Sequence, residues 1–138
     1  MAVDPNYRTL RRRAKELLLA AGSEVDVDSK ALLLFYAIEC GLKALYMDLH
    51  KLATTSIEGS RARSARSFGH RLDHLVVELR VPPSKISARA PNLALRNGVT
   101  LQVLDLHEAW RYGEKIDAHT QVVAWLDGIA TYVKQELR

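Results

Sequence analysis

The run from Leu32 to Asp48, LLLFYAIECGLKALYMD, constrains the fold more than any other part of this 138-residue chain. Apolar residues fall on nearly every side of a helix in its first half, which is typical of a central helix with neighbours on several faces. Glu39 and, four residues later, Lys43 are embedded in this run in the order that favours a helical ion pair. We expect Glu39 to contact groups from other helices and Lys43 to lie at an exposed edge, with its aliphatic part over apolar surface.

Apolar residues at steps of three and four also predict a first and a last helix. Asp4 followed by Pro5 predicts the start of the first, because aspartate caps helices and proline suits their first turn. Gly22 is expected to end this first helix, because glycine readily adopts left-handed backbone geometry. The apolar residues of the first helix are Tyr7, Leu10, Ala14, Leu17, Leu18 and Ala21, and those of the last are Val122, Leu126, Ile129, Val133 and Leu137.

Capping and helix-breaking residues predict where the helices between these two begin and end. Asp26 or Asp28 can cap the central helix, which we expect to reach about Leu49. The third helix is expected to open at Phe68-Gly69-His70. It should stop at Val81-Pro82-Pro83, because proline cannot donate the helical hydrogen bond and restricts the residue before it.

A fourth helix is expected over residues 101–110, with Gly113 bending or ending it. Residues 51–69 and 84–98 lack a hydrophobic period and predict exposed connections. No stretch shows convincing strand alternation, and there is no internal repeat. The expected fold is therefore all-α: a single domain over residues 1–138, forming an up-and-down bundle of four to five helices.

Composition indicates where in the cell the protein is expected to be located. The longest apolar run is far shorter than the ~20 residues that a membrane span needs, so we expect no membrane contact. The start, MAVDPNYRTLRRR, lacks the apolar stretch of a signal peptide. The single cysteine, Cys40, cannot form an internal disulfide. A reducing, cytoplasmic location is the resulting prediction.

The net charge of +4 is concentrated in two basic clusters. Such clusters can bind phosphates or an acidic partner, and they can equally be solvated surface. Composition leaves these alternatives open. The first cluster comprises Arg8, Arg11, Arg12, Arg13 and Lys15, and the second comprises Arg61, Arg63, Arg66 and Arg71.

No residue pattern predicts a metal or cofactor site. His70 and His74 share a helix face at a spacing of four, which suits two zinc ligands, but their neighbours supply no third ligand except Asp73, which points elsewhere. We therefore expect no metal ion and no cofactor. Neither a phosphate-binding glycine loop nor a nucleophile elbow is present, and Cys40 lies in an apolar stretch, where a thiol is usually inert.

Two segments combine residue types that suit a nucleotide. A histidine at the start of a helix, as expected for His70, lies where backbone N–H groups bind anions, although a capping or hinge role is the alternative. Trp110 and Tyr112 flank Arg111, so that rings can stack on a base while the guanidinium holds a phosphate. The alternative, favoured for Trp110, is a core anchor, with Tyr112 at the rim.

Three segments together resemble the HEPN family, whose name refers to nucleotide binding in higher eukaryotes and prokaryotes. They are FYAIECGLKALY at 35–46, GHRLDHL at 69–75 and RYGEK at 111–115, followed by a long last helix. The resemblance implies a small helical bundle that often dimerises and binds or cuts RNA or nucleotides. Members often work beside a nucleotidyltransferase-type partner, or in toxin–antitoxin and phage-defence systems.

Catalytic members of that family cut RNA without metal, using a closely spaced arginine and histidine in a site across the dimer. Here Arg63 and His70 precede the third helix instead of lying near the last one. Arg111 and His119 lie in the expected region but have seven residues between them, one more than the family pattern allows. These departures favour a binding member over a ribonuclease.

The resulting hypothesis is a homodimeric, HEPN-like module that binds RNA or a nucleotide, with an antitoxin or nucleotidyltransferase-type protein as partner. The runner-up is a metal-independent ribonuclease in which His70 or His119 is the general base and an arginine such as Arg111 stabilises the phosphorane. A third alternative is a structural interaction bundle. The candidate binding residues are Glu39, Lys43, Arg63, Arg66, His70, Arg111 and Tyr112.

Overall fold

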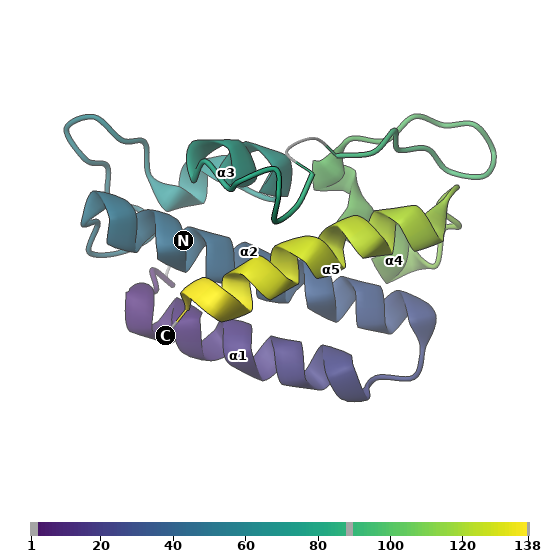
Figure 1. The fold of residues 1–138 in the computed structure, drawn as a ribbon, viewed down its shortest axis with the longest axis horizontal. Helices are drawn as coiled ribbons and strands as arrows, with labels where there is room; N and C mark the ends of the chain where they lie inside the picture. Colours follow the sequence, from purple (N-terminus) through teal and green to yellow (C-terminus); the bar gives the residue numbers. More distant parts are fainter. Residues whose placement is uncertain (1–2, 88–89, 138) are drawn as a thin grey trace.

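The computed structural model describes residues 3–87 and 90–137, and five α-helices form its framework (Figure 1). The long helix α2 runs through the middle, with α1 along one side, α3 and α4 on the other, and α5 crossing it on a further face. The all-α prediction is confirmed, since the described residues contain no strand. The helices are α1 (Tyr7–Ser23), α2 (Val27–His50), α3 (Leu72–Glu78), α4 (Leu106–Tyr112) and α5 (His119–Glu136), with 3₁₀ turns η1 (Ala65–Phe68) and η2 (Val103–Asp105).

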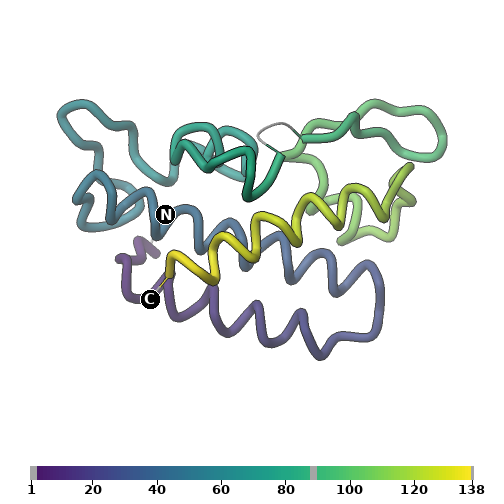
Figure 2. The backbone as a smooth tube through the Cα atoms, viewed as in Figure 1, coloured from purple at the N-terminus to yellow at the C-terminus, as the bar shows by residue number. Residues whose placement is uncertain are grey.

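The predicted course of α2 is confirmed. Asp26 caps it, its side chain accepting a hydrogen bond from the backbone N–H of Ser29, and the helix continues to His50, where Lys51 adopts left-handed geometry. α1 begins and α5 ends at the same end of the bundle (Figure 2). None of the helices in the described part of the chain is long and apolar enough to cross a membrane.

Both predicted ends of α1 are wrong. The side chain of Asn6 caps the helix, accepting from the backbone N–H of Thr9, so Asp4 and Pro5 lie outside it. Gly22 lies inside α1, which ends through an extended residue, Glu24, instead of a left-handed glycine. Asp4 has a different role because a distant segment offers it more hydrogen-bond donors than a helix N-terminus would.

Asp4 holds the connection between α2 and α3 against the start of α1. Its carboxylate accepts hydrogen bonds from the hydroxyls of Thr54, Thr55 and Ser56 and from the backbone N–H of Ser56, and it pairs with Arg66 at 3.3 Å. These hydrogen bonds hold the pKa of Asp4 well below its ordinary value. The connection at 51–69 is therefore anchored at Asp4 through Thr54–Ser56 and Arg66, while residues 56–63 are largely exposed, as predicted.

The third and fourth helices are shorter than predicted. Gly69 has a positive φ of 56°, so the chain turns there, and α3 begins only at Leu72. Before α4, Gln102 and Asp105 form a capping box around a 3₁₀ turn. Gly113 ends α4 in left-handed geometry (φ 73°), as the sequence predicts.

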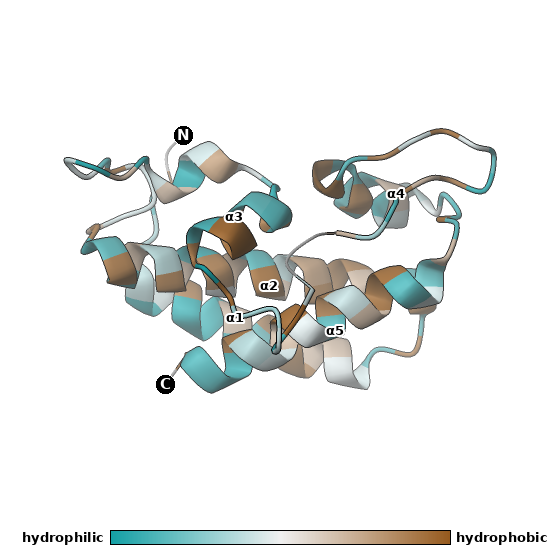
Figure 3. Cartoon of the chain, turned by 45° about the horizontal axis from the view of Figure 1, so that its top comes forward, coloured by the Kyte–Doolittle hydropathy of each residue, from teal (hydrophilic) through white to brown (hydrophobic). Residues whose placement is uncertain are grey.

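Apolar side chains from every helix meet in one core. Five of the twelve largest fully buried side chains come from α2, where Phe35, Ile38 and Leu42 are wholly inaccessible. In Figure 3 the helices carry hydrophobic and hydrophilic colours on different sides, as expected for helices that each bury one face. Trp110 is 3% exposed, so the core-anchor prediction for this residue is confirmed.

We expect Gly41→Ala to lower the free energy of unfolding by about 1–2 kcal/mol, the usual cost of overpacking a core. A Cβ at Gly41 would clash with the Cγ1 of Val133 on α5 and approach Leu137 Cδ1 to 3.3 Å. This cost should exceed the ~1 kcal/mol that alanine adds to a helix. Gly22→Ala in α1, where nothing lies within 4 Å, is the matched control and should be neutral or stabilising in urea unfolding. Equal effects at the two glycines would contradict the close packing of α2 on α5.

Candidate functional site

A cluster of polar side chains lies where α2 meets α3 and α4. Tyr36, Glu39 and Lys43 come from α2, at spacings that place them along one side of the helix. His70 comes from the turn before α3, and His107 and Arg111 come from successive turns of α4. We call these six residues the polar cluster.

Glu39 is the centre of one half of the polar cluster. Its Oε1 lies 2.6 Å from Nδ1 of His70, and its Oε2 lies 3.3 Å from Nζ of Lys43. The side chains of Glu39 and Lys43 are only 15% and 12% exposed, against 43% for His70. Glu39 therefore contacts another segment as predicted, whereas the prediction of an edge-exposed Lys43 is wrong.

The hydrogen bond to Glu39 determines which nitrogen of His70 can meet a ligand. A carboxylate only accepts hydrogen bonds, so Nδ1 of His70 is the donor. Nε2 is then the ring nitrogen left for a ligand, on a side chain that is 43% exposed. A carboxylate that orients an imidazole in this way recurs in catalytic and ligand-binding sites. Because α3 begins only at Leu72, this contact and not a helix N-terminus positions the ring.

His107, which the sequence reasoning missed, is the centre of the other half. It is 5% exposed, and its Nδ1 lies 3.2 Å from Tyr36 Oη and 3.2 Å from an Nη of Arg111. The same Arg111 nitrogen donates to Tyr36 Oη. Since a guanidinium can only donate, Nδ1 of His107 is an acceptor, and the ring is neutral with its proton on Nε2.

The two halves meet through their imidazole rings. The ring centroids of His70 and His107 are 4.0 Å apart, and Phe35 stacks on His107 at a centroid distance of 5.7 Å. Burial lowers the pKa of His107, and the neighbouring His70 and Arg111 lower it further. His107 is thus held neutral between a histidine and an arginine.

We expect the stability of the protein to fall with pH below the ordinary histidine pKa of 6.5, because the pKa of His107 is lowered. The unfolded chain binds a proton there before the folded chain does, so the contribution is complete above 6.5 and is lost as the pH falls toward the lower, folded value. Chemical denaturation across this range measures it.

His107→Gln should flatten this dependence, because glutamine can accept the same hydrogen bonds without titrating. His74→Gln is the control, since His74 is exposed and lies outside the polar cluster. An unchanged slope in His107→Gln would contradict the assignment.

The polar cluster carries more positive than negative charge. Glu39 is its one carboxylate, and Lys43 and His70 already contact it. Arg111 is exposed, and within residues 3–87 and 90–137 it forms no ion pair. Its hydrogen bond to Tyr36 is the main cause of a raised pKa. A fixed guanidinium held by neutral groups is suited to an anionic ligand.

The remaining candidate residues lie around the polar cluster or apart from it. Tyr112 is 73% exposed, with its ring centroid 6.0 Å from Cζ of Arg111. Arg66 joins Glu39 and Lys43 in lining a depression of about 240 Å³ beside the start of α1. Arg63 is held by Ser67 and lies over Phe68. His119 accepts a hydrogen bond from Nε1 of Trp110 at 3.1 Å and does not join the cluster.

Metal ligation and thiol chemistry find no support in the geometry. No group of three or more histidine, cysteine or acidic side chains is placed to hold a metal ion in the described part of the chain. Burial raises the pKa of Cys40 to about 11, so its thiol is protonated and unreactive at neutral pH.

No protein-family model, curated protein or solved structure matches this chain. The interpretation of the polar cluster therefore rests on its own geometry and charge.

Proposed function

We propose that the chain is an RNA- or nucleotide-binding module and that a phosphate of the ligand binds at the exposed side of the polar cluster. The observation that carries this proposal is Arg111, a positively charged group held in place by Tyr36 and His107, with no carboxylate partner among the described residues. A guanidinium that is already oriented loses little side-chain entropy when it binds a phosphate in a bidentate manner. His70 supplies a second contact through Nε2.

Tyr112 suits the base of the same ligand. Its ring is exposed beside Arg111, and a base that stacks on an aromatic ring contributes about 1–3 kcal/mol without demanding a sequence. Lys43 is too buried to contact a phosphate directly and acts through Glu39, which it holds against His70. Arg66, which lies in η1, lines a depression with Glu39 and Lys43, where a longer RNA would pass if it displaced the contact with Asp4.

The resemblance to the HEPN family supports the same assignment and supplies its setting. In this proposal the chain acts in the cytoplasm as a homodimer, beside an antitoxin or a nucleotidyltransferase-type partner. Sedimentation at micromolar concentration tests self-association: a dimer has twice the chain mass of 15.5 kDa, and a clean monomer would contradict it.

Metal-independent RNA cleavage is the second candidate, because Glu39 orients His70 as a general base beside the Arg111 cation. Cleavage also needs an acid that protonates the leaving oxygen. His107 lies closest to His70, but its lowered pKa keeps it neutral, so it is a poor acid at neutral pH. The geometry therefore supports binding better than cleavage.

One experiment tests both functions. A labelled single-stranded RNA is titrated with protein in chelator at about 50 mM salt and then recovered for size analysis. We expect salt-sensitive binding and intact RNA. An absence of binding at low salt would refute the proposal. Cleavage that is lost in His70→Ala and kept in His74→Ala would replace it with the ribonuclease.

A further inference from the structure

The side of α1 that faces away from the core carries a regular row of side chains. Arg8, Arg12, Lys15 and Leu19 follow steps of four, three and four, and all are exposed. The buried residues of α1 are Leu10, Ala14, Leu17 and Ala21, at the same steps but two positions later. Two positions correspond to about 200° around a helix, so the two rows lie on opposite sides. We call the exposed one the outer row.

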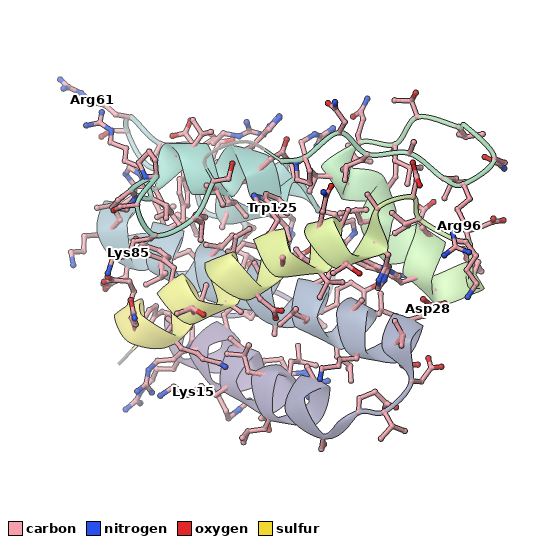
Figure 4. The ribbon with its side chains drawn as sticks, turned by 45° about the vertical axis from the view of Figure 1, so that its right-hand side comes forward. Lys15, Asp28, Arg61, Lys85, Arg96 and Trp125 are labelled. Carbon is pink, nitrogen blue, oxygen red and sulfur yellow. The ribbon has the colours of Figure 1, made fainter. Side chains whose placement is uncertain are left out.

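The outer row is cationic without a compensating acid. The nearest acid on α1 is Glu16, which lies beside the row and pairs with Arg13 at 3.6 Å. Within the described residues, Arg8, Arg12 and Lys15 form no ion pair. Lys15 lies far from Arg61 in Figure 4, whereas Arg66 of the second basic cluster contacts Val3 and Asp4 just before α1.

These charges weaken the helix that carries them. Like charges four residues apart destabilise a helix by about 0.2–0.5 kcal/mol per pair. Cations in the first turns also oppose the helix dipole, which favours acids there. α1 has no acid in its first turn, as is also true of α5, whereas α2, α3 and α4 have Asp28, Asp73 and Glu108. These unfavourable charges of the outer row form no ion pair that would offset them in the described part of the chain. We take this as an indication that a partner outside the chain offsets them.

The position of Leu19 indicates what kind of partner binds the outer row. It continues the row by one step of four and is 78% exposed, among the most exposed large apolar side chains described. A phosphate backbone does not use an apolar side chain, and the row has no aromatic ring on which a base could stack. A second helix matches the row well, since carboxylates at the same steps can face the cations while an apolar residue packs on Leu19.

We propose that the outer row is a docking surface for an acidic amphipathic helix of another protein. α1 lies on the opposite side of α2 from α3 and α4 (Figure 1), so this partner and a ligand at the polar cluster occupy different faces. The inference does not depend on the proposed function, because it uses none of the polar cluster residues.

The test uses a synthetic lactam-bridged helix of about 20 residues with glutamates and a leucine at steps of four, three and four. Binding is measured by anisotropy. The triple variant Arg8→Glu, Arg12→Glu, Lys15→Glu should weaken binding about tenfold or more, the expected sum of several exposed ion pairs. Leu19→Ser should weaken it about fivefold without changing the charge. Arg61→Glu, Lys85→Glu, Arg96→Glu is the control with equal charge change.

Several outcomes would overturn the inference. They are a parent protein that does not bind the helix, equal losses in the two triple variants, and equal binding of a scrambled peptide of the same composition. Binding of single-stranded RNA through the outer row, without binding of the acidic helix, would identify a nucleic-acid surface instead. The outer-row variant should melt close to the parent, because glutamates at these spacings repel one another as the cations do, while Arg8→Glu places one acid in the first turn of α1.

Discussion

Replacing Glu39 with alanine is expected to lower the free energy of unfolding by about 2–3 kcal/mol, below the full cost of breaking a buried ion pair because the site is partly open. The side chain of Lys43 is only 12% exposed and would lose its counter-ion. His70 would lose the carboxylate that orients it at 2.6 Å. Urea unfolding measures the first effect, and weaker RNA binding reports the second.

Two variants separate the charge effect from a general loss of packing. Glu16→Ala removes an exposed ion pair at α1 and should cost at most about 0.5 kcal/mol. The double variant Glu39→Leu, Lys43→Leu should recover most of the stability, because apolar residues often replace a buried pair well. It should not recover RNA binding, since His70 remains without its partner. A cost for Glu39→Ala equal to that of Glu16→Ala would contradict the account.

The long helices and the Glu39–Lys43 pair could be predicted because both depend on residues near each other in the chain. An apolar period over many turns identifies α1, α2 and α5, and a spacing of four brings Glu39 and Lys43 together. The bounds of the short helices α3 and α4 were harder to predict, because tertiary packing and capping determine where these helices begin. Asp4 shows the same limit: its capping preference was outweighed by hydroxyls 50 to 52 positions away.

The polar cluster could be predicted only in part. Glu39, Lys43, His70 and Arg111 were singled out, but their meeting depends on how α3 and α4 pack on α2. Tyr36 was missed because it looks like an ordinary core residue in an apolar stretch, and His107 because nothing in its local sequence marks it as buried. One local signal was available: His107 and Arg111 are four residues apart, so they share a helix face. Arg63 and Arg66 were grouped by charge, although Arg63 donates to the nearby Ser67 and Arg66 to the distant Val3 and Asp4.

Arg111→Ala is expected to weaken RNA binding at least tenfold, within the range for loss of a charged, oriented contact. Stability should change little, because Arg111 is exposed and Tyr36 can still donate to His107. Arg111→Lys should recover only part of the affinity, since an ammonium cannot bind a phosphate in the bidentate manner of a guanidinium. Anisotropy titration of a labelled RNA gives the dissociation constants.

Arg61→Ala is the matched control for Arg111→Ala. It removes the same charge from an exposed position in the connection at 51–69 and should change the affinity no more than about twofold. Similar losses in both variants would mean that RNA responds to net charge alone. The Arg111 site would then have no special role.

The most direct test of the central claim is an NMR titration of the histidine rings with a nucleoside monophosphate, because the chain carries five histidines in different places. We predict saturable shifts of His107, which lies 3.2 Å from Arg111, and of His70, whose ring centroid is 4.0 Å from that of His107, with His50 and His74 unmoved as internal controls. The pKa of His107 should also rise when the anionic phosphate binds, since a negative charge favours the protonated ring. Saturable shifts confined to His50 or His74, or no shift of any ring at millimolar ligand, would contradict a phosphate site at the polar cluster.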